Sequence, residues 1–249
     1  MDLSLIAGLV AAATAAGFVD SIAGGGGLIT VPVLMLAGMT PGQALATNKL
    51  QGSFGAATAA VSYGRSGLVD LRRQLPTAAL AFAAGGAGAV LVTALPTEVL
   101  RLALPVVLIG IALFFALKPG LNDLDRAARL SPAIFGLTLV PAIGFYDGLI
   151  GPGAGAFYML GFVMLAGHGV LRATAHTKLL NFSSNLGGLA VFALSGHPLW
   201  LVGLLMGAGQ ILGAALGARL ALRSGARIIK PLLVVTSTAL AARLLWQML

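Results

Sequence analysis

The chain has 249 residues, of which 58% are hydrophobic and only 9% charged, with a formal net charge of +8. A soluble domain carries about 25% charged residues, so the composition excludes an ordinary soluble protein and indicates an integral membrane protein. The positive charge lies mostly in short stretches between apolar runs, where it sets membrane orientation and does not indicate nucleic-acid binding. The absence of cysteine excludes disulfides, thiolate metal sites and cysteine nucleophiles.

Ten apolar segments divide the chain, and we expect each to be helical because a helix satisfies its own backbone hydrogen bonds in hydrocarbon. In order they are Leu3–Ala23, Leu28–Met39, Ala44–Tyr63, Leu75–Leu95, Val99–Leu117, Pro132–Ile150, Ala154–Ala166, Ala175–Leu194, Leu199–Leu222 and Ile228–Leu249. A spanning helix needs about 20 residues. Leu28–Met39 and Ala154–Ala166, with 12 and 13 residues, are too short and are predicted to be half-helices or re-entrant segments. The connections leave no room for an ATPase or receptor domain.

A ten-residue signature occurs twice, each time where a long apolar segment meets one of the short segments. The copies are Gly17-Phe18-Val19-Asp20-Ser21-Ile22-Ala23-Gly24-Gly25-Gly26 and, 127 positions later, Gly144-Phe145-Tyr146-Asp147-Gly148-Leu149-Ile150-Gly151-Pro152-Gly153. Five of the ten positions are identical, and at an offset of 129 Lys49 also matches Lys178. The repeat indicates gene duplication, with halves 1–117 and 132–249 joined by the linker 118–131.

Basic residues indicate how the halves lie in the membrane, because cytoplasmic loops carry an excess of lysine and arginine. Of the 15 basic residues, 11 lie in or beside four connections: Arg65, Arg72, Arg73, Lys118, Arg126, Arg129, Arg172, Arg219, Arg223, Arg227 and Lys230. With these connections in the cytoplasm, corresponding elements of the two halves face opposite ways. We therefore expect inverted repeats of about five segments each, a cytoplasmic linker and both termini outside the cell.

Asp20 and Asp147 lie inside apolar segments, a few residues before the glycine clusters. A carboxylate is unfavourable in hydrocarbon and marks a functional position there by default. Two roles are compatible with this placement. Each carboxylate accepts hydrogen bonds from backbone N–H groups freed by a helix break, or it takes up and releases a proton and so couples proton movement to transport.

Glycine clusters immediately precede both short segments: Gly24, Gly25, Gly26 and Gly27 in the first half, and Gly151 and Gly153 around Pro152 in the second. Glycine permits backbone conformations that bring a ligand against bare N–H groups. A helix N-terminus adds unpaired donors and the positive end of the helix dipole, which together favour an anion. The alternative is that glycines only allow close helix packing. We expect this role for two other sets of glycines: Gly85, Gly86 and Gly88, and Gly203, Gly207, Gly209 and Gly213.

Lys49 and Lys178 occupy matching places near the start of the third and eighth segments. Amide side chains accompany both lysines: Asn48, Gln51, Asn181 and Asn185. A lysine near a helix end commonly extends to the lipid headgroups. Its repetition, with amides at helical spacing, favours instead a polar face that lines a cavity, where the lysine counters an anion or pairs with an aspartate.

Neither a metal site nor an enzyme signature accompanies these residues. The three histidines are well separated in sequence, with no carboxylate at ligand spacing. The chain also lacks the G-x-S-x-G, H-E-x-x-H and P-loop patterns. We therefore expect no cofactor, no bound metal and no enzymatic activity.

The duplicated segment resembles a known family. A repeated G-x-x-D-x-x-x-G-x-G-G pattern that runs into a short helix containing Pro32, in a cysteine-free chain, is similar to the TauE/SafE sulfite-exporter family, also called the toluene-sulfonate uptake permeases. The stretch from Asp20 to Lys49 matches best, whereas the second copy has Gly-Pro-Gly-Ala-Gly at 151–155. The resemblance covers nearly the whole chain. It implies a multi-pass permease of the bacterial inner membrane that moves sulfite, sulfonates or related anions.

Together, the residues and the resemblance predict a secondary transporter, acting as an exporter, for a small sulfur-containing or organic anion. Alternating access would operate at a midplane site between the repeats, and proton coupling through Asp20 and Asp147 stays open. One alternative is an anion channel with the same site, and a weaker one is an intramembrane enzyme. The expected partners are a small anionic substrate and membrane lipid, without nucleic acid. A homodimer also stays open.

Overall fold

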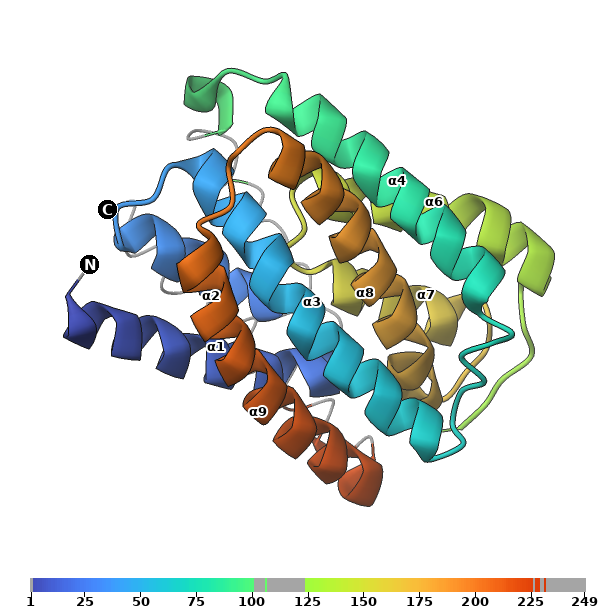
Figure 1. Ribbon diagram of the computed structural model, residues 1–249. Helices are drawn as coiled ribbons and strands as arrows, with labels where there is room; N and C mark the ends of the chain where they lie inside the picture. The colour runs from blue at the N-terminus through green and yellow to red at the C-terminus, as the bar shows by residue number, and fades with distance from the viewer. Residues whose placement is uncertain (1, 101–105, 107–123, 226, 229–230, 232–249) are drawn as a thin grey trace.

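A computed structural model describes residues 2–100, 106, 124–225, 227, 228 and 231. Within this part all regular structure is helical, as the sequence predicts (Figure 1). The helices are α1 (Leu3–Ala23), α2 (Gly26–Leu36), α3 (Pro41–Arg65), α4 (Leu75–Thr93), α6 (Pro132–Leu149), α7 (Ala154–Met164), α8 (Val170–Leu194) and α9 (Trp200–Ser224). Nearly all of the predicted segments Val99–Leu117 and Ile228–Leu249, and the first part of the linker, lie outside the described residues.

The first short helix begins earlier than the apolar pattern predicts. Gly25 takes a left-handed conformation, with φ of 94°, and is the N-cap of α2. The helix therefore starts at Gly26 instead of Leu28, so two glycines of the cluster form its first turn. Gly153, with φ of 86°, is likewise the N-cap of α7, which begins at Ala154 as predicted. Only glycine adopts this conformation routinely, which explains why the caps are glycines.

Two of the long helices also begin before their apolar runs. α3 starts at Pro41 instead of Ala44, because the Thr40 side chain accepts a hydrogen bond from the backbone N–H three residues later in a capping box. Proline is well tolerated at such a first position. α8 starts at Val170 instead of Ala175. Polar residues interrupt the first turns of both helices, Gln43 in α3 and Arg172 in α8, so hydropathy alone does not define where they begin.

Helix length separates spanning candidates from half-helices. α1, α4, α6 and α9 have between 18 and 25 residues and are long and apolar enough to cross a membrane. α2 and α7 have 11 residues each, or about 16 Å of helix, against a hydrocarbon thickness of about 30 Å. The two short helices therefore cannot span, in agreement with the prediction.

Helices from the two halves of the chain interlock. α9 packs against α1 and α3, while α4 packs against α6 and α8, and α3 and α8 pack against each other between them (Figure 1). Glycines allow these close approaches: a methyl group at Gly88 would collide with the Phe145 backbone, and one at Gly213 with the Thr14 backbone. A methyl group at Gly85 or Gly209 would also meet backbone, and one at Gly203 or Gly207 would meet a neighbouring side chain. The expected packing role is therefore confirmed for these glycines but not for Gly86, where an added methyl group meets nothing closer than 3.5 Å.

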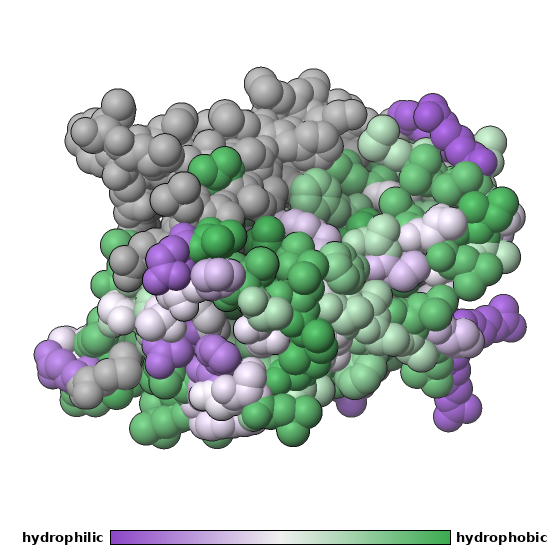
Figure 2. Space-filling model, turned by 90° about the horizontal axis from the view of Figure 1, so that it is seen from above, coloured by the Kyte–Doolittle hydropathy of each residue, from purple (hydrophilic) through white to green (hydrophobic). Residues whose placement is uncertain are grey.

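The distribution of polarity suits hydrocarbon surroundings. Large apolar side chains are exposed on the outer helices, such as Leu137 on α6 at 68% and Leu212 on α9 at 63%. Figure 2 shows apolar residues over much of the face seen from above. Polar side chains gather in the interior instead: Thr30, Asn48, Lys49, Gln51, Asp147, Lys178, Asn181, Ser184, Asn185 and Gln210. In a membrane such residues are costly unless paired, and they mark functional positions.

Candidate functional site

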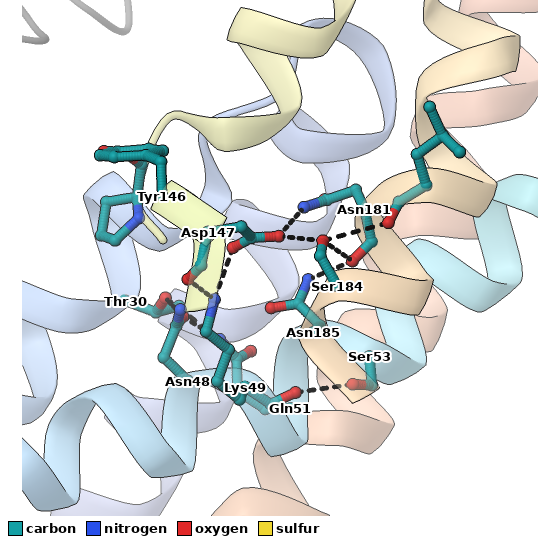
Figure 3. Close-up of polar contacts among 12 residues, drawn as sticks. Thr30, Asn48, Lys49, Gln51, Ser53, Tyr146, Asp147, Asn181, Ser184 and Asn185 are labelled. Carbon is teal, nitrogen blue, oxygen red and sulfur yellow. Dashed lines mark hydrogen bonds and ion pairs between the residues drawn. The ribbon is translucent and has the colours of Figure 1, made fainter. Parts of the chain in front are cut away.

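Two ion pairs cross between the halves of the chain. Lys49 on α3 lies with its Nζ 2.5 Å from Oδ1 of Asp147 on α6, and it also donates to the Asp147 backbone carbonyl (Figure 3). Lys178 on α8 lies with its Nζ 3.4 Å from Oδ2 of Asp20 on α1, and it also donates to the Asp20 carbonyl. Each lysine thus binds the aspartate of the other half. The lysines therefore pair with the aspartates and do not extend toward the lipid headgroups.

Both carboxylate oxygens of Asp147 accept hydrogen bonds. Figure 3 shows its carboxylate between Lys49 on one side and two side chains of α8 on the other. Asn181 Nδ2 donates to Oδ2 at 2.9 Å, and the Ser184 hydroxyl donates to the same oxygen. The side chain is only 2% exposed. Asp147 is therefore a buried, fully bonded anion.

Asp20 is more open. Its side chain is 18% exposed, and its Oδ1 accepts a hydrogen bond of 3.0 Å from the backbone N–H of Gly26, in the first turn of α2. The predicted capping role is therefore present at Asp20, together with the contact to Lys178. The Asp20 carboxylate therefore has fewer side-chain donors and more exposure than the Asp147 carboxylate.

The four charges balance one another. Two carboxylates and two ammonium groups lie inside the protein, and removing one member of a buried pair leaves the other uncompensated. The centre therefore has no net charge when all four groups are ionised. An additional anion is disfavoured in such a centre unless a carboxylate first becomes neutral.

A small cavity lies between the two ion pairs. Its volume is about 30 Å³, room for about two water molecules, since a cavity needs about 10–15 Å³ to hold one. The lining residues come from both halves: Asp20, Gly25, Gly26, Gly27, Asn48, Gln51, Gly52, Asp147, Gly151, Gly153, Ala154, Gly155, Asn181, Asn185 and Gln210. A substrate larger than a few atoms fits only if these walls separate.

The half-helices direct free donors into this region. In α2 the Gly26 N–H bonds to Asp20 and the Leu28 N–H bonds to the Gly25 carbonyl, which leaves the Gly27 N–H without a partner in the described part of the chain. In α7 the Gly155 N–H likewise has no hydrogen-bond partner among the described residues. Unpaired N–H groups at a helix N-terminus form an anion-binding arrangement.

An amide network forms the wall beside α2. Asn48 Oδ1 accepts hydrogen bonds from Thr30 Oγ1 at 2.6 Å and from Gln51 Nε2 at 2.8 Å (Figure 3). Gln51 is 1% exposed, yet its Oε1 has no hydrogen-bond partner among the described residues. Buried polar atoms are nearly always paired. The free Oε1, at the edge of the cavity, is an acceptor for a bound ligand or water.

Most of the predicted site residues meet at this cavity, and three lie just behind it. Lys49 and Lys178 reach the aspartates from the rear, and Gly24 packs on the α7 backbone, where a methyl group would collide with Ala156. Ala154 and Gly155, which also line the cavity, complete the predicted glycine cluster at 151–155, whereas sequence reasoning missed Gly52 and Gln210. Gln210 is a buried amide in the apolar helix α9, and a lone polar residue in such a segment is itself a signal of function.

The metal-ligating residue types do not cluster here. Within the ranges that the structure describes, no group of three histidine, aspartate or glutamate side chains could hold a metal ion. The chemistry available at the centre is therefore that of two paired carboxylates, two ammonium groups, amides and backbone N–H donors.

The fold and this centre define a multi-pass membrane protein whose interior holds paired charges at the N-termini of two half-helices. Residues 9–244 match the family described as Sulfite exporter TauE/SafE. The chain belongs to this family, and it is a membrane transporter, not an enzyme. The recognition made from the duplicated glycine and aspartate motif is thereby confirmed.

Several bacterial proteins are similar over nearly their whole length. The chain is 58% identical to "Probable membrane transporter protein ORF9" of Sinorhizobium sp, over 97% of this chain and 92% of that protein. It is 47% identical to "Probable membrane transporter protein YfcA" of Escherichia coli strain K12, over 93% and 86%, and 41% identical to a Haemophilus influenzae protein, "Probable membrane transporter protein", over 99% and 96%. No solved structure matches the chain.

Proposed function

We propose that this transporter carries a small sulfur-containing or organic anion, such as sulfite or a sulfonate, out of the cell by alternating access between two inverted repeats. The observation that carries the proposal is the pair of crossed ion pairs around a cavity at two half-helix N-termini. The proposed anion site comprises the residues predicted from the sequence, with Gly52, Gly155 and Gln210 added.

The repeat architecture is supported by matching contacts. α1 packs on α9 as α6 packs on α4, and α3 packs on α9 as α8 packs on α4. In the two halves, 1–117 and 132–249, α1 corresponds to α6, α3 to α8 and α4 to α9. Each contact therefore has a counterpart when the halves are exchanged. Loop charge supports opposite orientations, with the linker in the cytoplasm and the termini outside. Motion of one half against the other would open the cavity to each side in turn.

Asp20 is proposed as the residue that couples anion binding to a proton. The centre is neutral with both pairs formed, so protonation of Asp20 leaves Lys178 as an uncompensated cation beside free N–H donors. An anion then restores neutrality, and proton and anion bind together. Asp147, with its two additional donors, keeps Lys49 in place throughout.

Flux in proteoliposomes tests transport. Sulfite, methanesulfonate and acetate are loaded in turn, and the wild type should show saturable flux and counterflow for at least one of them. An anion channel would instead show conductance without counterflow. Chemical turnover of the anion, or no flux of any kind, would contradict the proposal.

The Asp20→Asn variant tests coupling. We expect it to reach the membrane in normal amount and to lose the dependence of flux on a pH gradient, because its amide cannot exchange a proton. Glu98→Gln is the matched control, since Glu98 is an exposed carboxylate just after α4 and lines neither the central cavity nor the larger one. Unchanged pH-gradient dependence in the Asp20 variant would remove this residue from the coupling mechanism.

A further inference from the structure

A second, larger cavity lies where α4, α6 and α8 begin and α7 ends. Its volume is about 520 Å³, within the range of about 300–1,000 Å³ typical of small-molecule sites. None of the residues around the central cavity lines it. The basic loops that are predicted to be cytoplasmic surround its mouth, which bears Arg73 and Arg172.

One wall of this second cavity is built from flat rings. Phe135 and Phe162 lie with ring centroids 4.6 Å apart, Phe162 stacks on His168 at 5.8 Å, and His168 stacks on His176 at 4.9 Å. Burial lowers the pKa of His168, which lies in the loop between α7 and α8, and nearby Arg172 lowers it further. The His168 imidazole is therefore neutral at neutral pH, and this wall favours a flat apolar group.

Other lining residues offer polar contacts. Gln74, which is 8% exposed, donates from Nε2 to the His176 carbonyl at 2.7 Å, and its buried Oε1 has no partner in the described residues. A buried acceptor without a donor is unfavourable, so a ligand or water that brings a donor completes it. At the rim the Arg172 guanidinium lies 3.2 Å from Asp125 and is half exposed, where it can meet an anionic group.

The second cavity points along α8 toward the central site. Arg172, His176 and Leu180 line it at four-residue intervals, and residues at this spacing share one face of a helix. The next residue on that face, Ser184, donates to Asp147. The cavity therefore ends about one helical turn from the buried ion pair.

A thin layer closes the gap between the two cavities. Val140 and Leu180 form the inner end of the second cavity. The Val140 carbonyl accepts a 3.1 Å hydrogen bond from the hydroxyl of Tyr158, which is fully buried. Asn181, adjacent to Leu180, already lines the central cavity. Displacement of this layer would join the two.

We propose that the second cavity is an access site, on the cytoplasmic side of the transport path, for an organic anion with a flat apolar body and a hydrogen-bond donor. The inference rests on the proposed function. Arg172 meets the anionic group, the rings contact the body, and the donor pairs with Gln74 Oε1. An inorganic anion would gain nothing from the ring wall, which selects an organic substrate.

Cysteine labelling tests the site without relying on transport. The chain has no cysteine, so Thr77→Cys, at a half-buried position that lines the cavity, introduces a single thiol. We expect a negatively charged methanethiosulfonate reagent to label it at least tenfold faster from the cytoplasmic side, and 4-hydroxybenzoate to slow the labelling more than benzoate or acetate does. Thr138→Cys is the control. Its side chain is exposed on the outer face of α6, which is expected to face lipid, so the charged reagent should not label it.

A sided flux measurement then tests the place of this site on the path. In oriented vesicles, Arg172→Gln should raise the KM for 4-hydroxybenzoate presented at the cytoplasmic face about threefold, the effect of losing one partly exposed charge contact, and leave the KM from the other face unchanged. Arg219→Gln, an exposed arginine of α9 that does not line the cavity, should change neither.

The outcomes separate this inference from the proposed function. Equal labelling of Thr77→Cys and Thr138→Cys, or no protection by 4-hydroxybenzoate, would overturn the access site even if the wild type transports anions. Equal KM changes at both faces would overturn its position on the path. If the wild type shows no flux but 4-hydroxybenzoate still protects Thr77→Cys from labelling, transport would be refuted and anion binding at this cavity would be supported.

Discussion

Removing the Lys49 ammonium should destabilise the protein more than removing the Lys178 ammonium. Lys49→Met keeps the length and apolar stem of the side chain and deletes only its charge. Asp147 then keeps its bonds from Asn181 and Ser184 but has no counter-ion, at a site where its side chain is 2% exposed. Removing one partner of a buried ion pair costs about 3–5 kcal/mol, and we expect a loss in this range.

Lys178→Met is the matched comparison. Its partner Asp20 is 18% exposed, and the two charges lie 3.4 Å apart instead of the 2.5 Å of the other pair. Solvent screens the remaining carboxylate, and the Gly26 N–H still binds it. We expect a loss of about 1–2 kcal/mol, between the ranges for exposed and buried pairs.

Thermal unfolding in detergent measures the difference. For a chain of this size 1 kcal/mol shifts Tm by about 2–4 °C, so Lys49→Met should lower Tm by about 6–20 °C and Lys178→Met by about 2–8 °C. Combining Lys49→Met with Asp147→Asn should restore part of the loss, since the double variant has no unpaired charge.

Two results would refute this reasoning. Equal Tm losses in the two lysine variants would show that the different exposure of Asp20 and Asp147 has no energetic consequence. A double variant that loses the full sum of its single variants would show that Lys49 and Asp147 do not interact.

Two further changes test the cavity and the loop beside its larger neighbour. Gly52→Ala should raise the KM for the transported anion about tenfold without lowering Tm, because the added methyl group meets no atom within 4 Å and enters the cavity of about 30 Å³. Gly8→Ala, where the added methyl group is equally free of contacts, is the control and should leave the KM unchanged. Similar KM values in the two variants would contradict the prediction. At Asp125 the Gly169 N–H, and then Arg172, hold the pKa of the carboxyl below its usual value, so its stabilising contribution is present above the ordinary pKa and lost as pH falls through the lowered one. Between pH 6 and pH 3 the wild-type Tm should therefore fall more than that of Asp125→Asn, and parallel pH profiles would count against this contribution.

The apolar pattern predicts the described helices well because each one is a long or short run bounded by turn residues. Leu3–Ala23 is predicted to the residue, and the other long helices to within a few residues. At α2 and α3 the errors lie where caps override hydropathy, whereas α8 begins five residues early without a side-chain cap. Gly26 belongs to the first turn of α2 because Gly25 is left-handed, and a backbone conformation of that kind leaves no trace in an apolar count.

The chemical content of the site is also visible in the sequence, but its pairing is not. Asp20, Asp147, Lys49 and Lys178 are conspicuous as charges in apolar surroundings. That each lysine binds the aspartate of the opposite half depends on how α3 and α8 cross, which no spacing encodes. Gln210 was missed for a related reason, since it reaches the cavity only because α9 packs against the first half of the chain.

The crossed ion pairs have a consequence for how such a chain could arise. Half 1–117 on its own contains Asp20 and Lys49, but each of these charges finds its counter-ion in the other half. On the inverted-repeat proposal, a single-copy ancestor would have needed a second identical chain, inserted the other way up, to neutralise its own buried charges. The loops of that ancestor would then have carried arginine and lysine evenly enough to permit both insertions. Duplication and fusion would have allowed the charge bias of each half to become fixed.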